Sequence, residues 1–341
     1  MKSPALALLL VLLSAQTPRG QQDAQPPSPA DEPKPVRISV IVTDRSGRPI
    51  NGLSVKDFEL RDDDVVQKLA SVEARSPQPR RLALLLDEFH VSEAAAPQVR
   101  EALTAFVDQE LRPDDLLVVF KPLDSIPSIR LTNDREEIRA AIASFEGRAG
   151  NYVPRTPLEE QTVGRSPALA EAARAQIVLS ALRALATRLG GVAGRSAIVL
   201  VSEGLPQVSR TMAIRSLPDL DMVERFANRY NVPVYVCDPR GDVPSDSAEE
   251  PQAMLRRIVE ETGGALFPAE ELAGGLKSMN RDLDGGYLLS YKPAHGEDGK
   301  FHTIKVRVLR RDAQARTRAG YVSPPSAEMR RLLRASTSPP S

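Results

Sequence analysis

The chain has 341 residues with 41% hydrophobic side chains, enough for one large or two modest domains with buried cores. Lys plus Arg and Asp plus Glu both number 45, so the formal net charge is zero and no basic excess points to nucleic acid. A single cysteine excludes an intramolecular disulfide and a thiolate zinc cluster, and three histidines argue against a multi-histidine metal centre. These numbers describe a neutral, cysteine-poor globular protein.

The first residues have the order of a secretory signal peptide. Lys2 precedes the apolar run of residues 5–13, and small and polar residues follow it. Nine apolar residues are too few to span a bilayer, and no later run is long enough for a transmembrane helix. We therefore expect residues 1–20 to be a signal peptide, cleaved between Ala15 and Gly20, and the protein to be exported to the periplasm or secreted.

Proline, serine and charge dominate the segments at both ends of the mature chain. Residues 21–35 read QQDAQPPSPADEPKP, which offers nothing to bury. Residues 323–341 contain one short basic stretch inside a proline- and serine-rich sequence. We predict a disordered linker at the first segment and a disordered tail at the second.

Residues 78–284 alternate buried-strand runs with amphipathic helices. The apolar runs lie at residues 82–86, 116–120, 197–201 and 232–236. Helical spacing of apolar residues predicts helices at residues 97–111, 134–145, 169–189, 217–230 and 248–262. Residues 146–166, rich in Gly, Pro and charge, are expected to be a loop. This alternation predicts an α/β fold with a doubly wound, mostly parallel sheet.

The segments on either side of this core have the two-residue period of β-strands. Residues 36–77 begin with the β-branched run VRISVIV and predict two or three short strands. Within residues 285–322, the segments 286–293 and 301–309 are expected to form a β-hairpin with a long turn. Because the ends of an inserted domain usually lie close together, we expect the two flanks to join into one small β domain.

Carboxylates follow the buried strands, at the edge where an open α/β sheet binds ligands. They are Asp87, Glu88, Asp124, Glu203 and Asp238. An edge rich in oxygen atoms is what Mg²⁺ or Ca²⁺ requires. The alternative is that strand ends meet solvent, where Asp commonly caps a helix or turn.

The order LALLLDEFHVS, long helix, SAIVLVSEG and VPVYVCD resembles a von Willebrand factor A domain. Two flanking stretches, VRISVIVTDRSGRPINGLSVKDFELRDD before it and GYLLSYKPAHGEDGKFHTIKVRV with RAGY after it, are similar to the A-domain-related proteins of Acidobacteria and their neighbours. The resemblance covers residues 36–322. It implies an A-type fold with β flanks and binding of another protein.

Family A domains often hold a metal ion through a D-x-S-x-S motif, a loop threonine and a later aspartate. Asp87 matches the first aspartate, and Glu203 stands at the place of the last. Phe89 and Val91 fill the serine positions, and Ser92 lies one residue out of register. The loop threonine is Thr156 or Thr162, a choice that the sequence leaves open. The resemblance thus implies a degenerate metal site, with at most weak Mg²⁺ or Ca²⁺ binding at Asp87 and Glu203 and no cofactor.

Three other features invite functional interpretations that the residues around them do not favour. Asp87, His90 and Ser92 are close in sequence, but triads are assembled by fold geometry, and neither G-x-S-x-G nor G-x-G-x-x-G is present. Cys237 lies in an apolar strand and is expected to pack as a small hydrophobic residue. The acidic run of residues 62–64 is expected to be a charged turn between strands, with calcium binding as the alternative.

Together these observations predict an exported, non-enzymatic protein whose A-type domain binds an unidentified protein partner, and neither nucleic acid nor an integral membrane span. The expected contact residues are Asp87, Glu88, His90, Ser92, Ser202, Glu203 and Asp238. Two alternatives stay open. One is a hydrolase that uses Asp87, His90 and Glu203, and the other is a structural cell-envelope component held by its basic, proline-rich tail.

Overall fold

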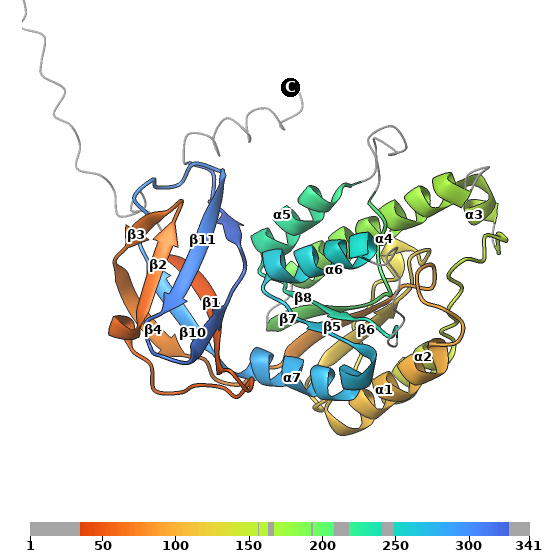
Figure 1. Ribbon diagram of the computed structural model, residues 1–341, viewed down its shortest axis with the longest axis horizontal. Coiled ribbons are helices and arrows are strands. Elements are labelled where there is room, and N and C mark those ends of the chain that lie inside the picture. The colour runs from red at the N-terminus through yellow and green to blue at the C-terminus, as the bar shows by residue number, and fades with distance from the viewer. Residues whose placement is uncertain are drawn as a thin grey trace, which may run out of the picture. The chain divides into compact units, whose positions relative to one another are not determined.

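The computed structural model describes residues 35–155, 157–162, 167–191, 194–207, 218–240 and 249–326. These residues form one five-stranded parallel sheet with helices and two four-stranded antiparallel sheets (Figure 1). The predicted signal peptide, the linker up to residue 34 and the tail from residue 327 lie outside the described residues. No helix within the described ranges is both long and apolar enough to span a membrane.

The parallel sheet is built from the apolar runs that the sequence predicts as buried strands. Its strands, in spatial order, are β6 (Leu116–Phe120), β5 (Arg80–Leu86), β7 (Arg195–Val201), β8 (Val234–Cys237) and β9 (Leu266–Phe267). Residues 82–86 and 197–201 have no exposed surface, as expected for parallel strands covered on both faces. Cys237 is buried in this sheet, as predicted.

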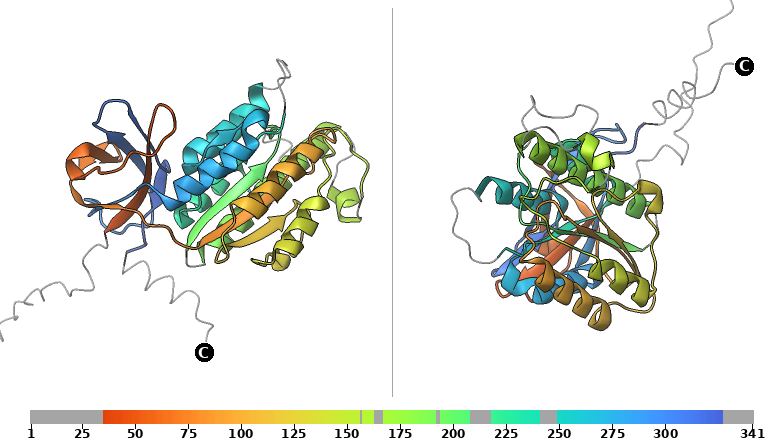
Figure 2. Two further views of the ribbon diagram at one scale, coloured as in Figure 1. Left: turned by 90° about the horizontal axis from the view of Figure 1, so that it is seen from below. Right: turned by 90° about the vertical axis from the view of Figure 1, so that its right-hand side faces the viewer.

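Helices lie on both sides of this sheet (Figure 2). One apolar core contains side chains of α1 (Ala96–Gln109), α2 (Arg135–Ala143) and α7 (Leu272–Asp284). The other contains side chains of α4 (Pro167–Gly190), α5 (Leu220–Tyr230) and α6 (Glu249–Thr262). The predicted α/β architecture with a parallel sheet between helices is therefore confirmed.

The flanking segments pair with one another in two antiparallel sheets. One has the order β12 (Ala313–Arg316), β1 (Val36–Asp44), β10 (Tyr287–Tyr291) and β4 (Leu69–Ala74). The other has the order β13 (Gly320–Val322), β11 (Phe301–Val308), β2 (Phe58–Asp62) and β3 (Val65–Gln67). Alternate residues of both sheets, such as Ile38, Leu60, Leu289 and Ile304, share one apolar core. We call this pair of sheets the β-sandwich.

The expected hairpin of residues 286–293 and 301–309 is wrong. Strand β10 lies between β1 and β4, whereas β11 lies between β13 and β2 in the other sheet. Strands β10 and β11 thus both pair with strands of the N-terminal flank. Apolar residues lie opposite one another in these pairs, such as Ile38 opposite Leu289 and Leu60 opposite Val306. Two sheets bury an apolar face that a lone hairpin would leave in water.

Several elements were not predicted from the sequence. They are α3 (Pro157–Thr162) within the expected loop, α7, the strands β3, β4, β9, β12 and β13 as separate elements, and the 3-10 turns η2 (Val55–Asp57), η3 (Ile126–Ser128) and η5 (Ala269–Glu271). Helix α7 contains Gly274 and Gly275, which lower intrinsic helix propensity. Gly275 is buried, and a Cβ there would overlap the ring of Phe267. Close packing against Phe267 therefore requires glycine at position 275. The same glycine lowers helix propensity, so the sequence does not predict this helix.

Candidate functional site

The site lies where β5 and β7 end side by side, and Asp87 is at its centre. Asp87 directly follows β5 and has no exposed surface. One carboxylate oxygen, Oδ2, lies 2.7 Å from His90 Nδ1 and accepts a hydrogen bond from Ser202 Oγ at 2.8 Å. The other accepts from the backbone N–H groups of Phe89 and His90. The chain's own groups thus engage both oxygens of this carboxylate.

His90 is held between two carboxylates. Its Nδ1 faces Asp87, and its Nε2 lies 3.5 Å from Glu171 Oε2 on helix α4. Burial acts to lower the pKa of His90, but the charge of Asp87, the hydrogen bond to it and the neighbouring Glu171 raise this pKa to about 9. At neutral pH, His90 is therefore an imidazolium cation between two anions.

Glu203 and Ser92 form a second link across the same edge. The backbone N–H and the hydroxyl of Ser92 both donate to Glu203 Oε1, at 2.8 and 2.7 Å. The backbone N–H of Glu203 donates to the carbonyl of His90 at 3.1 Å. The structure thus brings Asp87, His90, Ser92, Ser202 and Glu203 into one hydrogen-bonded network, which joins the loops after β5 and β7.

Glu88 and Asp238 stand at the same edge but face other partners. Glu88 pairs with Lys121 at 2.8 Å, beyond β6. Asp238 accepts from the backbone N–H of Arg240 at 3.1 Å and from the side-chain amide of Gln252 at 3.2 Å. Glu88 therefore lies outside the network around Asp87, whereas Asp238 is joined to it through Arg240, which pairs with Asp238 and donates to the carbonyl of Glu203.

The two serine positions of the family's motif lie inside apolar cores. Val91 belongs to the core on the α1 side of the sheet, and Phe89 to the core on the α4 side. Phe89 is 2% exposed and Val91 is fully buried, so neither position offers an oxygen ligand. Thr156, and the side chain of Thr162, lie outside the described residues. With Asp87 engaged by His90 and Ser202, these residues do not fit an octahedral Mg²⁺ shell.

A buried set of charges beside the network was not found from the sequence. Arg148 and Arg174 both approach the buried carboxylate of Glu159. The guanidinium of Arg174 also stacks 4.9 Å from the centre of the Phe89 ring and 4.8 Å from that of Tyr152. Glu171 and Arg174 lie three residues apart in the alanine-rich start of α4. Two charged residues among alanines were the sequence feature that could have indicated this buried set of charges.

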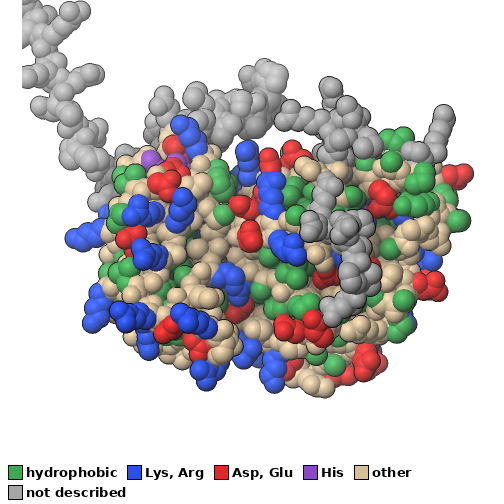
Figure 3. All heavy atoms as spheres, in the orientation of Figure 1, with side chains coloured by type: hydrophobic (Ala, Val, Ile, Leu, Met, Phe, Trp, Pro, Cys, Tyr) green, Lys and Arg blue, Asp and Glu red, His purple; other side chains and the backbone are tan. Residues whose placement is uncertain are grey.

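The network opens to solvent through a shallow hollow of about 230 Å³. Asp87 and Ser202 have no exposed surface, so they support this edge from below and do not form its surface. The lining residues with partly exposed side chains include Tyr152, Glu171, Glu203 and Arg240. On the face drawn in Figure 3, Lys and Arg side chains lie among Asp and Glu side chains.

Among the described residues, the side chains that come close enough together to bind one metal ion lie in the β-sandwich and not around Asp87. Asp62, His295 and His302 place one such atom each within 4.8 Å of the others. The two imidazole rings stack face to face, with centres 3.5 Å apart and an interplanar angle of 2°. A metal ion lies in the plane of each imidazole that binds it, so one ion cannot bind both rings as they stand. His302 instead bridges Asp63 and Asp298, at 2.8 and 2.9 Å.

The acidic run of residues 62–64 has a structural place here. Asp63 and Asp64 form the turn between β2 and β3, both with positive φ. Asp62 is 2% exposed and accepts hydrogen bonds from the hydroxyls of Tyr291 and Tyr321, at 2.7 and 3.0 Å. The expected charged turn is present, and its first carboxylate anchors the β-sandwich core.

Comparison with known proteins gives matches among solved structures. No family model matches the sequence, and no curated protein matches it. Among solved structures, the chain is similar to manganese-loaded TRAP protein of Plasmodium vivax, with 11% identity, a TM-score of 0.37, and coverage of 74% of this chain and 98% of that one. The chain's own five-stranded parallel sheet between helices fits a von Willebrand factor A-like fold.

Proposed function

We propose that the protein is exported and that the hollow beside His90 binds a protein partner without catalysis and without a metal ion. The chain would then be an A-type binding protein with the paired β flanks of the Acidobacteria-type proteins that its sequence resembles. The observation that carries this proposal is the Asp87 carboxylate, which lies 2.7 Å from His90 Nδ1 and 2.8 Å from Ser202 Oγ.

Charge balance supports independence from metal ions. A divalent cation at such an edge neutralises carboxylates that would otherwise repel one another. Here the imidazolium of His90 stands between Asp87 and Glu171, and the guanidinium of Arg174 lies 3.6 Å from Glu171. Two side-chain cations therefore supply the positive charge that a bound ion would bring.

The surroundings of His90 also support the non-catalytic assignment. A general base works best with a pKa near the operating pH, whereas a pKa of about 9 keeps His90 protonated at neutral pH. Its Nε2 faces the carboxylate of Glu171, and the hydroxyls of Ser92 and Ser202 donate to Glu203 and Asp87. A hydrolase would need a nucleophile beside Nε2.

A photo-crosslinking amino acid in place of Tyr152 tests binding at this hollow. Tyr152 lines the hollow, and the matched control is Val65, a strongly exposed residue at the β-sandwich edge. We expect a discrete protein adduct at position 152 in native cells, absent at position 65, persistent in EDTA and lost when Glu203→Lys is added. An adduct that EDTA abolishes, or no adduct at position 152, contradicts the proposal.

Export is tested separately by N-terminal sequencing of the protein from native cells. The charge and apolar pattern of residues 1–20 predicts a mature N-terminus between residues 16 and 21. An intact Met1 would contradict export while leaving the binding proposal open to its own test.

A further inference from the structure

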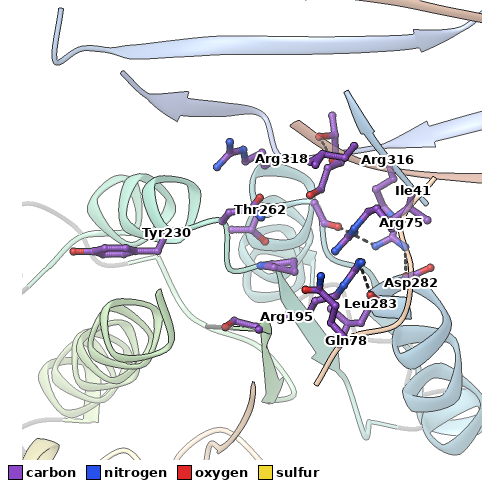
Figure 4. Close-up of a pocket in the computed structure, with 18 of the residues that line it drawn as sticks. Ile41, Arg75, Gln78, Arg195, Tyr230, Thr262, Asp282, Leu283, Arg316 and Arg318 are labelled. Carbon is purple, nitrogen blue, oxygen red and sulfur yellow. Dashed lines mark hydrogen bonds and ion pairs between the residues drawn. The ribbon is translucent and has the colours of Figure 1, made fainter. Parts of the chain in front are cut away.

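A second hollow, unrelated to the edge around Asp87, lies where the β-sandwich meets the α/β core. Its volume is about 430 Å³, which is the size of a small-molecule site. Its walls come from both sides of the junction, with Ile41 and Arg75 on one and Tyr230 and Asp282 on the other (Figure 4). We call it the junction cavity.

Four arginines line the junction cavity: Arg75, Arg195, Arg316 and Arg318. The carboxylates that line it are Glu73 and Asp282. Arg316 pairs with Asp282, donates to the carbonyl of Gly263 at 3.0 Å and lies over the ring of Tyr235. Arg316 thereby neutralises Asp282, and among the described residues no ion pair joins Arg75, Arg195 or Arg318 to Asp282 or Glu73.

Two of these three arginines donate to carbonyl groups, which satisfy hydrogen bonds without cancelling charge. Arg195 donates to the carbonyls of Leu283 and Ser76, at 2.7 and 2.6 Å. Arg318 donates to the carbonyls of Asn228 and Arg37, at 2.5 and 3.3 Å. The Nε atoms of both guanidinium groups are buried without an acceptor among the described residues.

Arg75 is the third, and its guanidinium has no hydrogen-bond or ion-pair partner in the described part of the chain. Burial lowers its pKa to about 10, repulsion from Arg195 adds to this effect, and Tyr235, Asp282 and Asp284 act against it. Asp284, the other carboxylate that acts on this pKa, pairs with Arg112 at 3.1 Å. Arg75 and Arg195 thus bring two like charges to one cavity, an arrangement that an anion would stabilise.

We propose that the junction cavity binds a small oxyanion, a carboxylate or a phosphate group, between Arg75 and Arg195. Planar guanidinium groups present pairs of N–H donors that match the oxygen spacing of both groups. The apolar side chains of Ile41 and Leu283 and the ring of Tyr235 complete the walls and would contact the organic part of a ligand. A ligand held there would contact both the β-sandwich and the α/β core.

Isothermal titration of the mature protein with sodium phosphate and with sodium glutarate tests this site, with sodium chloride at matched ionic strength as the reference. We expect saturable binding of at least one probe, weakened at least tenfold in Arg75→Gln. Arg311→Gln is the charge-matched control, because Arg311 is exposed on the β-sandwich, and it should leave the affinity unchanged. Tighter binding of phosphate would identify a phosphate ester as the ligand class, and tighter binding of glutarate an organic acid.

A thermal unfolding measurement separates loss of the site from loss of the fold. The side chain of Arg75 makes no hydrogen bond to any residue that the structure describes, so without a probe Arg75→Gln should keep or raise the midpoint temperature by relieving repulsion from Arg195. The probe that binds should raise the midpoint of the wild type and of Arg311→Gln more than that of Arg75→Gln. No saturable binding of either probe, or equal affinity in wild type and Arg75→Gln, would overturn the proposal.

Discussion

At the scale of single residues, the site is defined by what surrounds His90. Its imidazole lies between Asp87 and Glu171, and the backbone around it is tied to Glu203. Proximity in sequence suggested a catalytic interpretation for Asp87, His90 and Ser92. The structure places the Ser92 hydroxyl on Glu203 instead. The chemistry of His90 is therefore that of a buried cation.

This arrangement makes stability depend on pH above neutrality. The pKa of His90 is about 9 in the fold and about 6.5 in an unfolded chain, so protonated His90 stabilises the fold fully below about pH 6.5. That contribution, of the order of 3 kcal/mol, should disappear as pH rises through about 9. Chemical denaturation of wild type and His90→Gln should give a difference in unfolding free energy that shrinks from pH 6 to pH 10. A difference that stays constant with pH would contradict the assignment.

At the scale of elements, the sequence predicted strands better than their partners. Continuous apolar runs located β5, β6, β7 and β8 to within about two residues, because a strand covered on both faces has no polar positions. The pairing of β10 and β11 was wrong, since nearness in sequence says nothing about which of two sheets a strand enters. Helix α7 was missed because its glycine pair serves packing against Phe267.

The two neighbouring glycines of α7 give a paired prediction. Gly274 is exposed and a Cβ there would have nothing within 4 Å, so Gly274→Ala should stabilise the protein by about 0.5–1 kcal/mol through helix propensity. Gly275→Ala should destabilise it by about 1–3 kcal/mol, because the added methyl overlaps the ring of Phe267. Urea denaturation measures both changes. Equal effects of the two substitutions would show that the packing described for α7 is wrong.

The candidate site was predictable only in part, because the sequence locates strands and helices better than it locates the contacts between them. Strand ends meet at one edge of a parallel sheet, so Asp87, Ser202 and Glu203 were expected together and are found together. Glu171 and Arg174 arrive from α4, and helical periodicity tells which face is apolar but not which charged residue meets a distant loop. Nor could the sequence indicate that Asp87 is wholly buried.

At the scale of the whole molecule, the β-sandwich joins the two ends of the folded chain. Strand β10 lies between β1 and β4, so neither of these two N-terminal strands keeps a partner strand without the C-terminal segment, whereas β2 and β3 still pair with each other. Arg195 on β7 also donates to the carbonyls of Ser76, in the N-terminal flank, and of Leu283, near the end of α7. The flanks therefore depend on one another.

Deletion of residues 285–322 tests this dependence. Because β1 would lose both β10 and β12, amides of residues 36–74 should lose most of their protection in hydrogen exchange. Amides of residues 82–86, in the middle of the parallel sheet, are the internal control and should stay protected. Unchanged protection of residues 36–74 would show that the N-terminal strands fold without the C-terminal ones.

We propose that His90 and Arg174, two cations of the chain itself, supply the positive charge that a metal ion would bring to this edge. Isothermal titration with MgCl₂ at neutral pH tests it most directly, with Asp87→Asn and Glu88→Gln as a matched pair of carboxylate-to-amide variants. Asp87 is engaged by His90 and Ser202, and the side chains of Phe89 and Val91 carry no oxygen atom, so we predict no saturable binding below about 1 mM in any of the three proteins. Micromolar Mg²⁺ affinity in the wild type that Asp87→Asn abolishes and Glu88→Gln retains would contradict the account.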